Sequence, residues 1–403
     1  KVKVEETFYQ QLLETSDTQF GAGTLSNLQL SLTGNDTLLK LGSNLSNGFP
    51  PILVGANHSL AFLSDGTIKA WGWNGWGQLG DGSTTNRSTP VSVSGITSAN
   101  PAVAVAAGYL YSLAVLSDGT VKAWGDNRFG QLGDCSTTNR TTPVSVSGIT
   151  SANPAVAVAA GQYHSLALLA DGTIKAWGLG GYGQLGDGSG TNSFTPVSVS
   201  GITNAVAIAA GDYHSLALLS DGTIKAWGLG DYGQLGNGTT TQSLSPVSVS
   251  GLTNVIAVTG GCKHSLALLS DGTIKTWGWN VYGQLGDGST TNRSIPVSVL
   301  GLTNVIAVDG GLYHSLALLS DGTIKAWGYN ADSQLGDGST TNRTSPVSIS
   351  GITNAVAVAG GYNYSLAFLS DNTVKAWGRN TSGQLGDGTI VNRNSPVTVS
   401  GVT

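Results

Sequence analysis

Short runs of β-prone residues alternate with turn residues along most of the chain. From about residue 50 onward, runs of Val, Ile, Leu, Ala and Thr are separated by Gly, Asp, Asn and Pro. Runs of about five residues with this composition are typical of short strands rather than helices. Four of them recur within residues 211–260, taken as one unit. The pattern therefore predicts four short strands per unit.

The pair Trp-Gly marks an internal repeat. Its spacings are 53, 53, 50, 50, 50 and 50 residues, and the tryptophans are Trp71, Trp124, Trp177, Trp227, Trp277, Trp327 and Trp377. The two longer spacings have three extra residues in the loop after Gly-Ile-Thr, which a surface loop tolerates. We therefore predict a seven-unit domain over residues 49–403.

Each unit also contains a tight hairpin at Asp-Gly. The sequence Ser-Asp-Gly-Thr separates two of the runs, and Asp-Gly accepts the positive φ of a type I′ turn. In the seventh unit Asn372 replaces the glycine, and Asn is the next best residue for a left-handed conformation. We expect a type I′ turn at this point of every unit.

Seven four-stranded units favour a closed ring. We predict an all-β, seven-bladed β-propeller of four-stranded blades, because radial repetition leaves only short sheet edges. An open solenoid is the alternative, but it needs atypical capping units, and here the first and last units keep the full pattern. The chain ends on a fourth strand near Pro396, and the first unit opens at Ile52 on the strand that would follow it. We expect the two ends to meet.

The repeat resembles a known family. The string Gly-x-x-His-Ser-Leu-Ala-Leu-x-x-Asp-Gly-x-x-x-x-Trp-Gly, followed by Gly-Gln-Leu-Gly, is similar to the regulator of chromosome condensation (RCC1-like) repeat over residues 50–403. This resemblance implies a seven-bladed propeller. It implies no single activity, because one fold supports unrelated functions.

Composition narrows the function classes. The net charge is -5 and only 10% of residues are charged, so we expect no nucleic-acid partner, which would require a basic face. No run of eighteen apolar residues exists, so we expect no membrane span. The surface is poor in Lys and rich in Ser, Thr, Asn and Gly, and position 1 is not Met. We expect a secreted, extracellular protein whose export signal has been removed.

One repeat position carries only His or Tyr. A ring of imidazoles in a pore could hold a metal ion or titrate near neutral pH. However, a position that accepts both residue types requires an aromatic ring with a polar tip, hydrogen-bonded to a neighbouring blade. We interpret the set as a structural ring without metal: His58, Tyr111, His164, His214, His264, His314 and Tyr364.

Catalytic motifs are not found in the sequence. It contains no Gly-x-Ser-x-Gly elbow, no His-Glu-x-x-His and no phosphate loop. The loop Gly-Asp-Gly-Ser-Thr-Thr-Asn-Arg around Asp81 has too few carboxylates for calcium, so we interpret it as a solvated turn. Cys135 and Cys262 are expected to be free thiols. We predict no enzyme activity and no cofactor.

The loops after Trp-Gly differ between the units and are rich in aromatic residues. Equivalent loops of a propeller lie on one face, and Trp and Tyr dominate the contact energy of protein interfaces. The competing interpretation is that these rings cover the blade edges. The candidate protein-binding face comprises Trp73, Trp76, Phe129, Tyr182, Tyr232, Trp279, Tyr282 and Tyr329.

Residues 1–48 do not repeat and contain all three glutamates of the chain, Glu5, Glu6 and Glu14. Alternating residues predict a β-rich N-terminal arm. A segment of this size without disulfide or metal rarely folds alone, so we expect it to dock. It can dock on its own propeller, or it can add strands to a neighbouring molecule and so build filaments.

These features favour a non-enzymatic, extracellular structural or interaction protein, with a rigid propeller and an arm that mediates docking or assembly. The alternative is a secreted inhibitor resembling the propeller-type β-lactamase inhibitor proteins, with the aromatic loops as the contact surface. The guanine nucleotide exchange role of the family's namesake ranks lower. This sequence lacks the basic tail and the wedge insertion that the resemblance would require.

Overall fold

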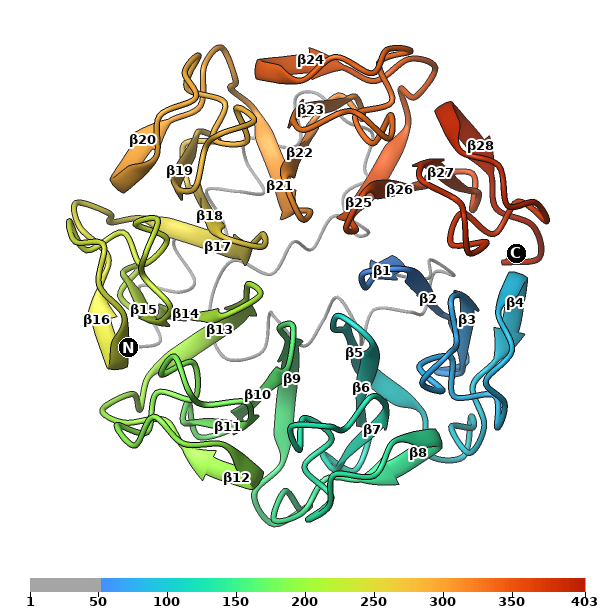
Figure 1. The fold of residues 1–403 in the computed structure, drawn as a ribbon, viewed down its shortest axis with the longest axis vertical. Coiled ribbons are helices and arrows are strands. Elements are labelled where there is room, and N and C mark those ends of the chain that lie inside the picture. Colours follow the sequence, from blue (N-terminus) through green and yellow to red (C-terminus); the bar gives the residue numbers. More distant parts are fainter. Residues whose placement is uncertain (1–51, 403) are drawn as a thin grey trace, which may run out of the picture.

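The computed structural model describes residues 52–402; the predicted arm, residues 1–48, lies outside the described residues. Seven four-stranded antiparallel sheets surround a central channel as the blades of a propeller (Figure 1). We number the blades 1 to 7 in chain order. The predicted all-β, seven-bladed fold with four-stranded blades is confirmed.

The strands of blades 1 and 2 are β1 (Ile52–Val54), β2 (His58–Phe62), β3 (Ile68–Gly72), β4 (Arg87–Ser92), β5 (Ala102–Ala107), β6 (Tyr111–Leu116), β7 (Val121–Gly125) and β8 (Arg140–Ser145). Those of blades 3 and 4 are β9 (Ala155–Ala160), β10 (His164–Leu169), β11 (Ile174–Gly178), β12 (Ser193–Ser198), β13 (Ala205–Ala210), β14 (His214–Leu219), β15 (Ile224–Gly228) and β16 (Ser243–Ser248). Those of blades 5 to 7 are β17 (Val255–Gly260), β18 (His264–Leu269), β19 (Ile274–Gly278), β20 (Arg293–Ser298), β21 (Val305–Gly310), β22 (His314–Leu319), β23 (Ile324–Gly328), β24 (Arg343–Ser348), β25 (Ala355–Gly360), β26 (Tyr364–Leu369), β27 (Val374–Gly378) and β28 (Arg393–Thr398).

Each blade consists of four consecutive strands, with the first innermost and the fourth outermost. The repeat unit that starts at Gly211 is therefore offset from blade 4 by one strand, because its last run, β17, is the innermost strand of blade 5. The loops explain the offset. Gly211 donates from its backbone N to His214 O over 2.9 Å, which joins β13 and β14 as a hairpin. The loop after β16 instead crosses to the next blade.

The Asp-Gly hairpin turn differs from the prediction of a type I′ turn. Gly66 has a φ of 77°, but Asp65 keeps a negative φ. Gly66 N bonds to Leu63 O over 2.9 Å, and Leu63 N bonds to Thr67 O, which makes a three-residue loop ending in a left-handed glycine. The Asp65 carboxylate stabilises this loop by accepting from Thr67 N over 2.9 Å. Asn372, with a φ of 68°, takes the glycine's position as predicted.

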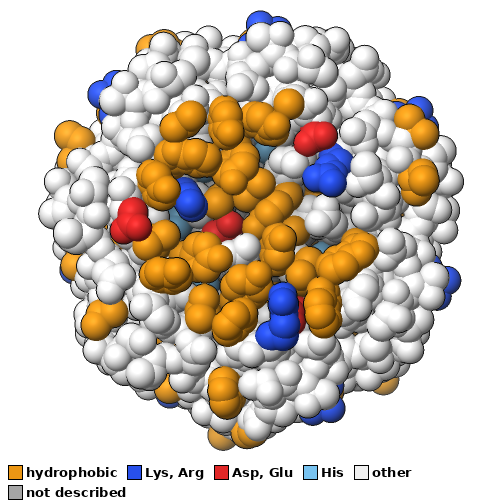
Figure 2. Space-filling view, viewed as in Figure 1, with side chains coloured by type: hydrophobic (Ala, Val, Ile, Leu, Met, Phe, Trp, Pro, Cys, Tyr) orange, Lys and Arg blue, Asp and Glu red, His pale blue; other side chains and the backbone are white. Residues whose placement is uncertain are grey.

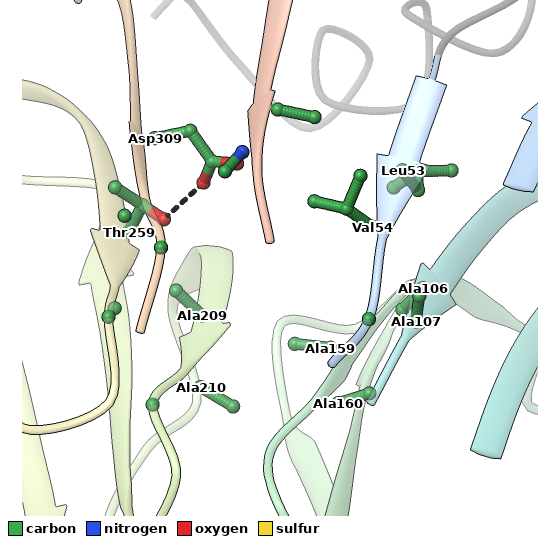
Figure 3. Close-up of a pocket in the computed structure, with 18 of the residues that line it drawn as sticks. Leu53, Val54, Ala106, Ala107, Ala159, Ala160, Ala209, Ala210, Thr259 and Asp309 are labelled. Carbon is green, nitrogen blue, oxygen red and sulfur yellow. Dashed lines mark hydrogen bonds between the residues drawn. The ribbon is translucent and has the colours of Figure 1, made fainter. Parts of the chain in front are cut away.

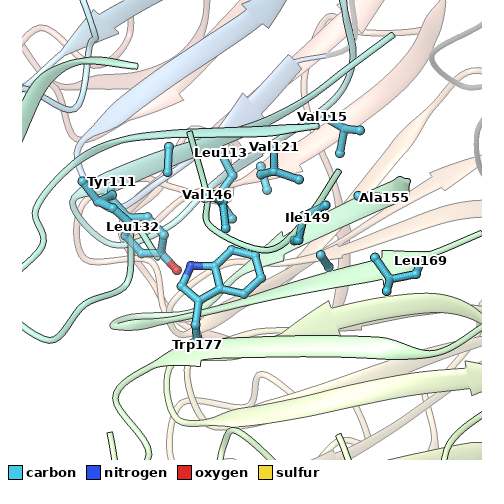
Figure 4. Close-up of a cluster of buried hydrophobic side chains, with 13 residues drawn as sticks. Tyr111, Leu113, Val115, Val121, Leu132, Val146, Ile149, Ala155, Leu169 and Trp177 are labelled. Carbon is cyan, nitrogen blue, oxygen red and sulfur yellow. The ribbon is translucent and has the colours of Figure 1, made fainter. Parts of the chain in front are cut away.

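The hydrophobic core is divided among the seams between blades. In one cluster Trp177 of β11, fully buried, packs against Leu113, Val121 and Leu132 of blade 2 (Figure 4). The other six tryptophans of the Trp-Gly pairs are buried in the same way. Each blade therefore inserts its tryptophan into the preceding blade.

The ring closes between blade 7 and blade 1 through this same seam. Trp71 Nε1 of blade 1 donates to Gln384 O of blade 7 over 2.9 Å, and Ser59 Oγ donates to the same oxygen over 2.9 Å. Strands β1 and β28 belong to different sheets, so neither end completes the other's blade. The first and last blades meet through β1, which packs against β25 and β26 of blade 7 and does not reach the last strand, β28.

Candidate interaction face and central channel

The His and Tyr side chains of the expected structural ring lie fully buried at the seams between blades. His58 Nε2 lies 3.0 Å from Ser112 Oγ of the next blade, and the other four histidines make the same contact at 2.9–3.0 Å. The two tyrosines donate instead to a backbone oxygen of the next blade, Tyr111 to His164 O and Tyr364 to His58 O. The side chain at this repeat position therefore links each blade to the next one by a hydrogen bond.

The serine partner fixes the tautomer of each imidazole. Ser265 Oγ donates its single hydrogen to Gln234 O over 3.0 Å, so it accepts from Nε2 of His214 over 2.9 Å. Nδ1 is then unprotonated, and it is buried without a hydrogen-bond partner in all five histidines. Burial lowers the pKa of these imidazoles from 6.5 to about 3 or 4. They are neutral at pH 7.

The Gly-Gln-Leu-Gly motif binds the next blade through its backbone. Gln78 O accepts from Ser112 Oγ over 3.0 Å and from Trp124 Nε1 over 2.9 Å. The Gln78 side chain stays in its own loop, where Oε1 accepts from Trp76 N over 3.1 Å. The recurring Gln, Ser and Trp residues are thus occupied in the seams.

The Asp-Gly-Ser-Thr loops are exposed at Gly82, Thr84 and Thr85, as expected of a solvated turn, but the carboxylate of their Asp is largely buried. The Asp81 side chain is only 7% exposed, and Arg87 pairs with it at 2.8 Å. Asn74, buried beneath, donates to Asp81 Oδ1 over 3.2 Å and accepts from Leu79 N over 2.9 Å. Although burial opposes it, hydrogen bonds from Ser83 and Arg87 hold the pKa of Asp81 below its ordinary value. The same Asn-Asp-Arg lock recurs in blades 2, 5, 6 and 7.

Blades 3 and 4 replace this lock. Gly180 and Gly230 stand at the position of Asn74, and Ser193 stands at that of Arg87. A Cβ on residue 180 would lie 1.9 Å from Thr191 O, so the loop backbone occupies the space that an Asn side chain would fill. The two blades therefore differ from the other five in loop conformation as well as in sequence.

The eight predicted aromatic residues lie in loops on one face of the ring, and seven of them join contacts between aromatic rings or with a cation. In blades 4 to 6, Trp279 lies 5.8 Å from Tyr232 and 5.5 Å from Tyr282, measured between ring centroids, and Tyr282 lies 4.7 Å from Tyr329. Trp73 packs within its own loop, against Gly75. Figure 2 shows hydrophobic side chains gathered around the centre of one face, with few charges among them.

Four tyrosines that the sequence analysis missed complete these contacts. Tyr163 lies 4.9 Å from Phe129, Tyr213 lies 5.3 Å from Tyr182, and Tyr313 lies 4.9 Å from Trp279. The fourth is Tyr109, 5.8 Å from Tyr163. All four stand in the Gly-x-x-His loop, whose two middle positions also vary between units. The variation that pointed to the Trp-Gly loops would have found them.

Two cationic side chains, those of Arg128 and Lys263, lie against aromatic rings of this face. Arg128 lies 4.8 Å above the centroid of Trp76 and pairs with the buried Asp126. Lys263 Nζ lies 4.6 Å from the centroid of Tyr232 and 5.7 Å from that of Trp279. Cation-π contacts of this kind hold both side chains against the face. We call the predicted aromatic residues, the four tyrosines and these two cations the aromatic face.

Side chains from several blades meet at the mouth of the channel. Asp212 Oδ2 accepts from Cys262 Sγ over 2.9 Å and from Tyr362 OH over 3.2 Å, although Tyr362 belongs to blade 7 and Asp212 to blade 4. Gln162 Nε2 lies 3.4 Å from Tyr362 OH. Burial raises the pKa of Asp212, Cys262 and Tyr362. These four residues form what we call the plug, and its thiol is protonated at neutral pH. Both cysteines are free, as predicted.

Behind the plug the channel encloses a cavity of about 410 Å³. Its walls are the innermost strands of the seven blades, largely Ala, Val and Gly (Figure 3). Asp309 stands in this wall and accepts from Thr259 Oγ1 over 2.9 Å. In residues 52–402 no group of three or more His, Cys, Asp or Glu side chains is placed to hold a metal ion. Nor does this range contain a helix long and apolar enough to cross a membrane.

The seven sheets and their seams define a seven-bladed β-propeller. Residues 18–349 match the family model described as the RCC1-like domain, and residues 355–384 and 371–403 each match the regulator of chromosome condensation (RCC1) repeat. The chain belongs to the RCC1-like domain family.

Similar proteins differ in what they do. The chain is 34% identical over 150 residues to the ultraviolet-B receptor UVR8 of Arabidopsis thaliana, covering 37% of this chain and 34% of the receptor. It is 34% identical over 172 residues to the probable E3 ubiquitin-protein ligase HERC4 of Homo sapiens, covering 42% of this chain and 16% of HERC4. The matches therefore span about a third or less of these relatives.

Solved structures share the fold at low identity. Yeast RCC1 (Prp20), solved with Kap60, superimposes with a TM-score of 0.78 at 22% identity, covering 92% of this chain and 88% of Prp20. Human WBSCR16 gives a TM-score of 0.70 at 24% identity, covering 80% of this chain and 88% of that protein. These likenesses establish the architecture alone.

Proposed function

We propose that this chain is a non-enzymatic interaction module that binds a globular protein through the aromatic face. The observation that carries the proposal is the pair of aromatic clusters on one side of the propeller, one across blades 2 to 4 and one across blades 4 to 6. Most of these rings are only partly buried, so a partner can still cover them. Trp, Tyr and Arg are the residue types that dominate binding energy at protein interfaces.

Two further observations support a binding role. The recurring polar residues are occupied in the seams and locks described above, which leaves the varying loops for outside contacts. In addition, structurally similar propellers bind proteins: Prp20 is described bound to Kap60 and as binding Gsp1p and histones.

Cross-linking from single positions tests the proposal. A photo-reactive amino acid at Tyr329, on the aromatic face, should capture a partner protein, whereas the same residue at Thr67, in a hairpin on the opposite face, should not. With the captured partner purified, the triple substitution of Trp76, Trp279 and Tyr282 by Ala should weaken the Kd at least about 30-fold, since the loss of even one hot-spot residue costs about 2 kcal/mol. Equal capture from both faces, or an unchanged Kd, would contradict the proposal.

We also propose that the protein is extracellular and that residues 1–48 mediate docking or assembly between subunits. Support comes from the sequence, namely the low charge and the non-repeating segment, because the arm lies outside the described residues. Deletion of residues 1–48 should leave a folded propeller but abolish larger assemblies, seen by electron microscopy and sedimentation. Unchanged assembly would refute the role of the arm. If the captured partner is a secreted enzyme that loses activity on binding, the alternative of an inhibitor is favoured.

A further inference from the structure

The channel wall carries one charged residue where the repeat places small ones. Asp309 of β21 pairs with Leu316 in the sheet register. In five other blades the residue at this register position has a small side chain, without charge: Ala106, Ala159, Ala209, Thr259 and Ala359. An ionised carboxylate in such a wall is costly unless it is compensated. Blade 6 is therefore an exception that the fold does not require.

The contacts of Asp309 compensate its charge only in part, since burial raises the pKa of this carboxyl even though hydrogen bonds oppose the rise. Oδ1 accepts from Thr259 Oγ1 over 2.9 Å, and Oδ2 accepts from the backbone N of Gly360 over 2.8 Å. Neither donor carries a positive charge. The ion pairs of residues 52–402 join Arg to Asp in the locks and at Asp126, and none includes Asp309. The backbone N–H of Gly310 is a third neutral donor to this carboxylate, which leaves one of its four lone pairs for a further donor.

The rest of the cavity wall combines small apolar side chains with the open backbone edges of the innermost strands. Besides Thr259, the side chains labelled around the cavity in Figure 3 are small or apolar, and include Val54, Ala159 and Ala209. At the mouth, Gln162 Oε1 is buried without a hydrogen-bond partner, and Asp212 acts as an acceptor. Among these side chains, the free polar atoms at the mouth are thus acceptors. A volume of about 410 Å³ is within the range of small-molecule pockets.

We propose that the channel binds a small organic ammonium ion, whose N-H groups donate to the Asp309 carboxylate while its hydrocarbon part lies along the alanine wall. A bare divalent cation does not suit the site, because it needs several oxygen ligands and Asp309 is one carboxylate among methyl groups. A neutral alcohol of the same size would leave the carboxylate without a counter-charge. This site is separate from the protein-binding role of the aromatic face.

Binding of n-butylammonium to the full chain at pH 7.5 tests the proposal, by calorimetry and by NMR shifts of the ligand. We expect saturable binding at one site, and at least tenfold weaker binding of n-butanol. Asp309→Ala should abolish the binding of n-butylammonium. This variant carries the residue that blades 2, 3, 4 and 7 have at the same position, so it is expected to fold, and its thermal unfolding checks that. Asp321→Asn, in an exposed hairpin turn, is the matched control and should bind as the wild type does.

Three results would overturn the proposal. In the first, the wild type and a folded Asp309→Ala variant bind n-butylammonium equally well. In the second, the wild type binds n-butanol as tightly as n-butylammonium. In the third, n-butylammonium shows no saturable binding, which would mean a channel filled by water alone. Trp279→Ala, on the aromatic face, should leave n-butylammonium binding unchanged. The proposal of an ammonium site and the proposal of a protein-binding face can therefore be contradicted independently of each other.

Discussion

At the scale of single residues, position 180 shows how the presence or absence of an Asn side chain goes with the conformation of the loop that follows. In five blades an Asn at this position bonds the loop that follows through its side-chain amide. In blade 3 the carbonyl of Thr191 occupies that space, 1.9 Å from where a Cβ would be. Asn and Arg occur together in five blades, and Gly and Ser occur together in the other two. The pairing follows from this competition for one space.

The first prediction concerns this exclusion. Gly180→Asn should destabilise the propeller by about 2 kcal/mol, because the new side chain overpacks against a backbone oxygen that cannot move aside cheaply. The midpoint of urea unfolding measures the change.

The neighbouring Gly181 supplies the control. Nothing lies within 4 Å of a Cβ at that position, and the residue is exposed, so Gly181→Asn should change stability by less than about 0.5 kcal/mol. Replacing residues 187–193 with residues 287–293 in the Gly180→Asn background should restore stability, because the donor loop leaves room for Asn. Equal midpoints for the two single variants would contradict the exclusion.

At the scale of elements, the strands could be predicted from the sequence, but which four of them form one blade could not. Alternating β-prone runs and the period of 50 residues were enough to predict four strands per blade, because each strand is bounded by Gly, Asp or Pro. The blade boundary was not fixed by the period, since a repeat can be cut at any loop. It depends on which loop forms a hairpin, here the one at Gly211. The turn type was wrong because the Asp65 side chain bonds Thr67 N and keeps a negative φ.

The sequence located only part of the aromatic face. Variation between units identified the Trp-Gly loops, yet Tyr163, Tyr213 and Tyr313 lie in a different loop that reaches the same face. The plug was out of reach of sequence reasoning, because Asp212 and Tyr362 meet only across the channel. Contacts between residues 150 positions apart depend on closure of the ring, which no local pattern contains.

At the scale of the whole molecule, the hydrogen bonds to the Gln carbonyls of the seven seams form a closed ring in which they all run the same way, from each blade to the blade before it. In each seam the Gln carbonyl of one blade accepts from Ser and Trp of the next, and the ring closes between blade 7 and blade 1 at Gln384. Five of the seven seams contain a buried neutral imidazole. Any condition that charges the imidazoles therefore acts on most of the ring at once.

The last prediction is that the propeller loses stability steeply in mild acid. The folded-state pKa of each of the five histidines is lowered from 6.5 to about 3 or 4, so between pH 6.5 and pH 4 the unfolded chain binds up to five more protons than the folded one. Stability is complete above pH 6.5 and falls with pH by up to about 7 kcal/mol per unit. Burial raises the pKa of Asp212 and Asp309, which opposes this loss for two groups only.

Urea unfolding at pH 7.5 and pH 5.0 measures how steeply stability depends on pH. His264→Tyr, which copies blades 2 and 7, should reduce this slope by about one fifth. A slope near zero would show that the folded ring takes up protons over this pH range as readily as the unfolded chain does, which contradicts the lowered pKa values.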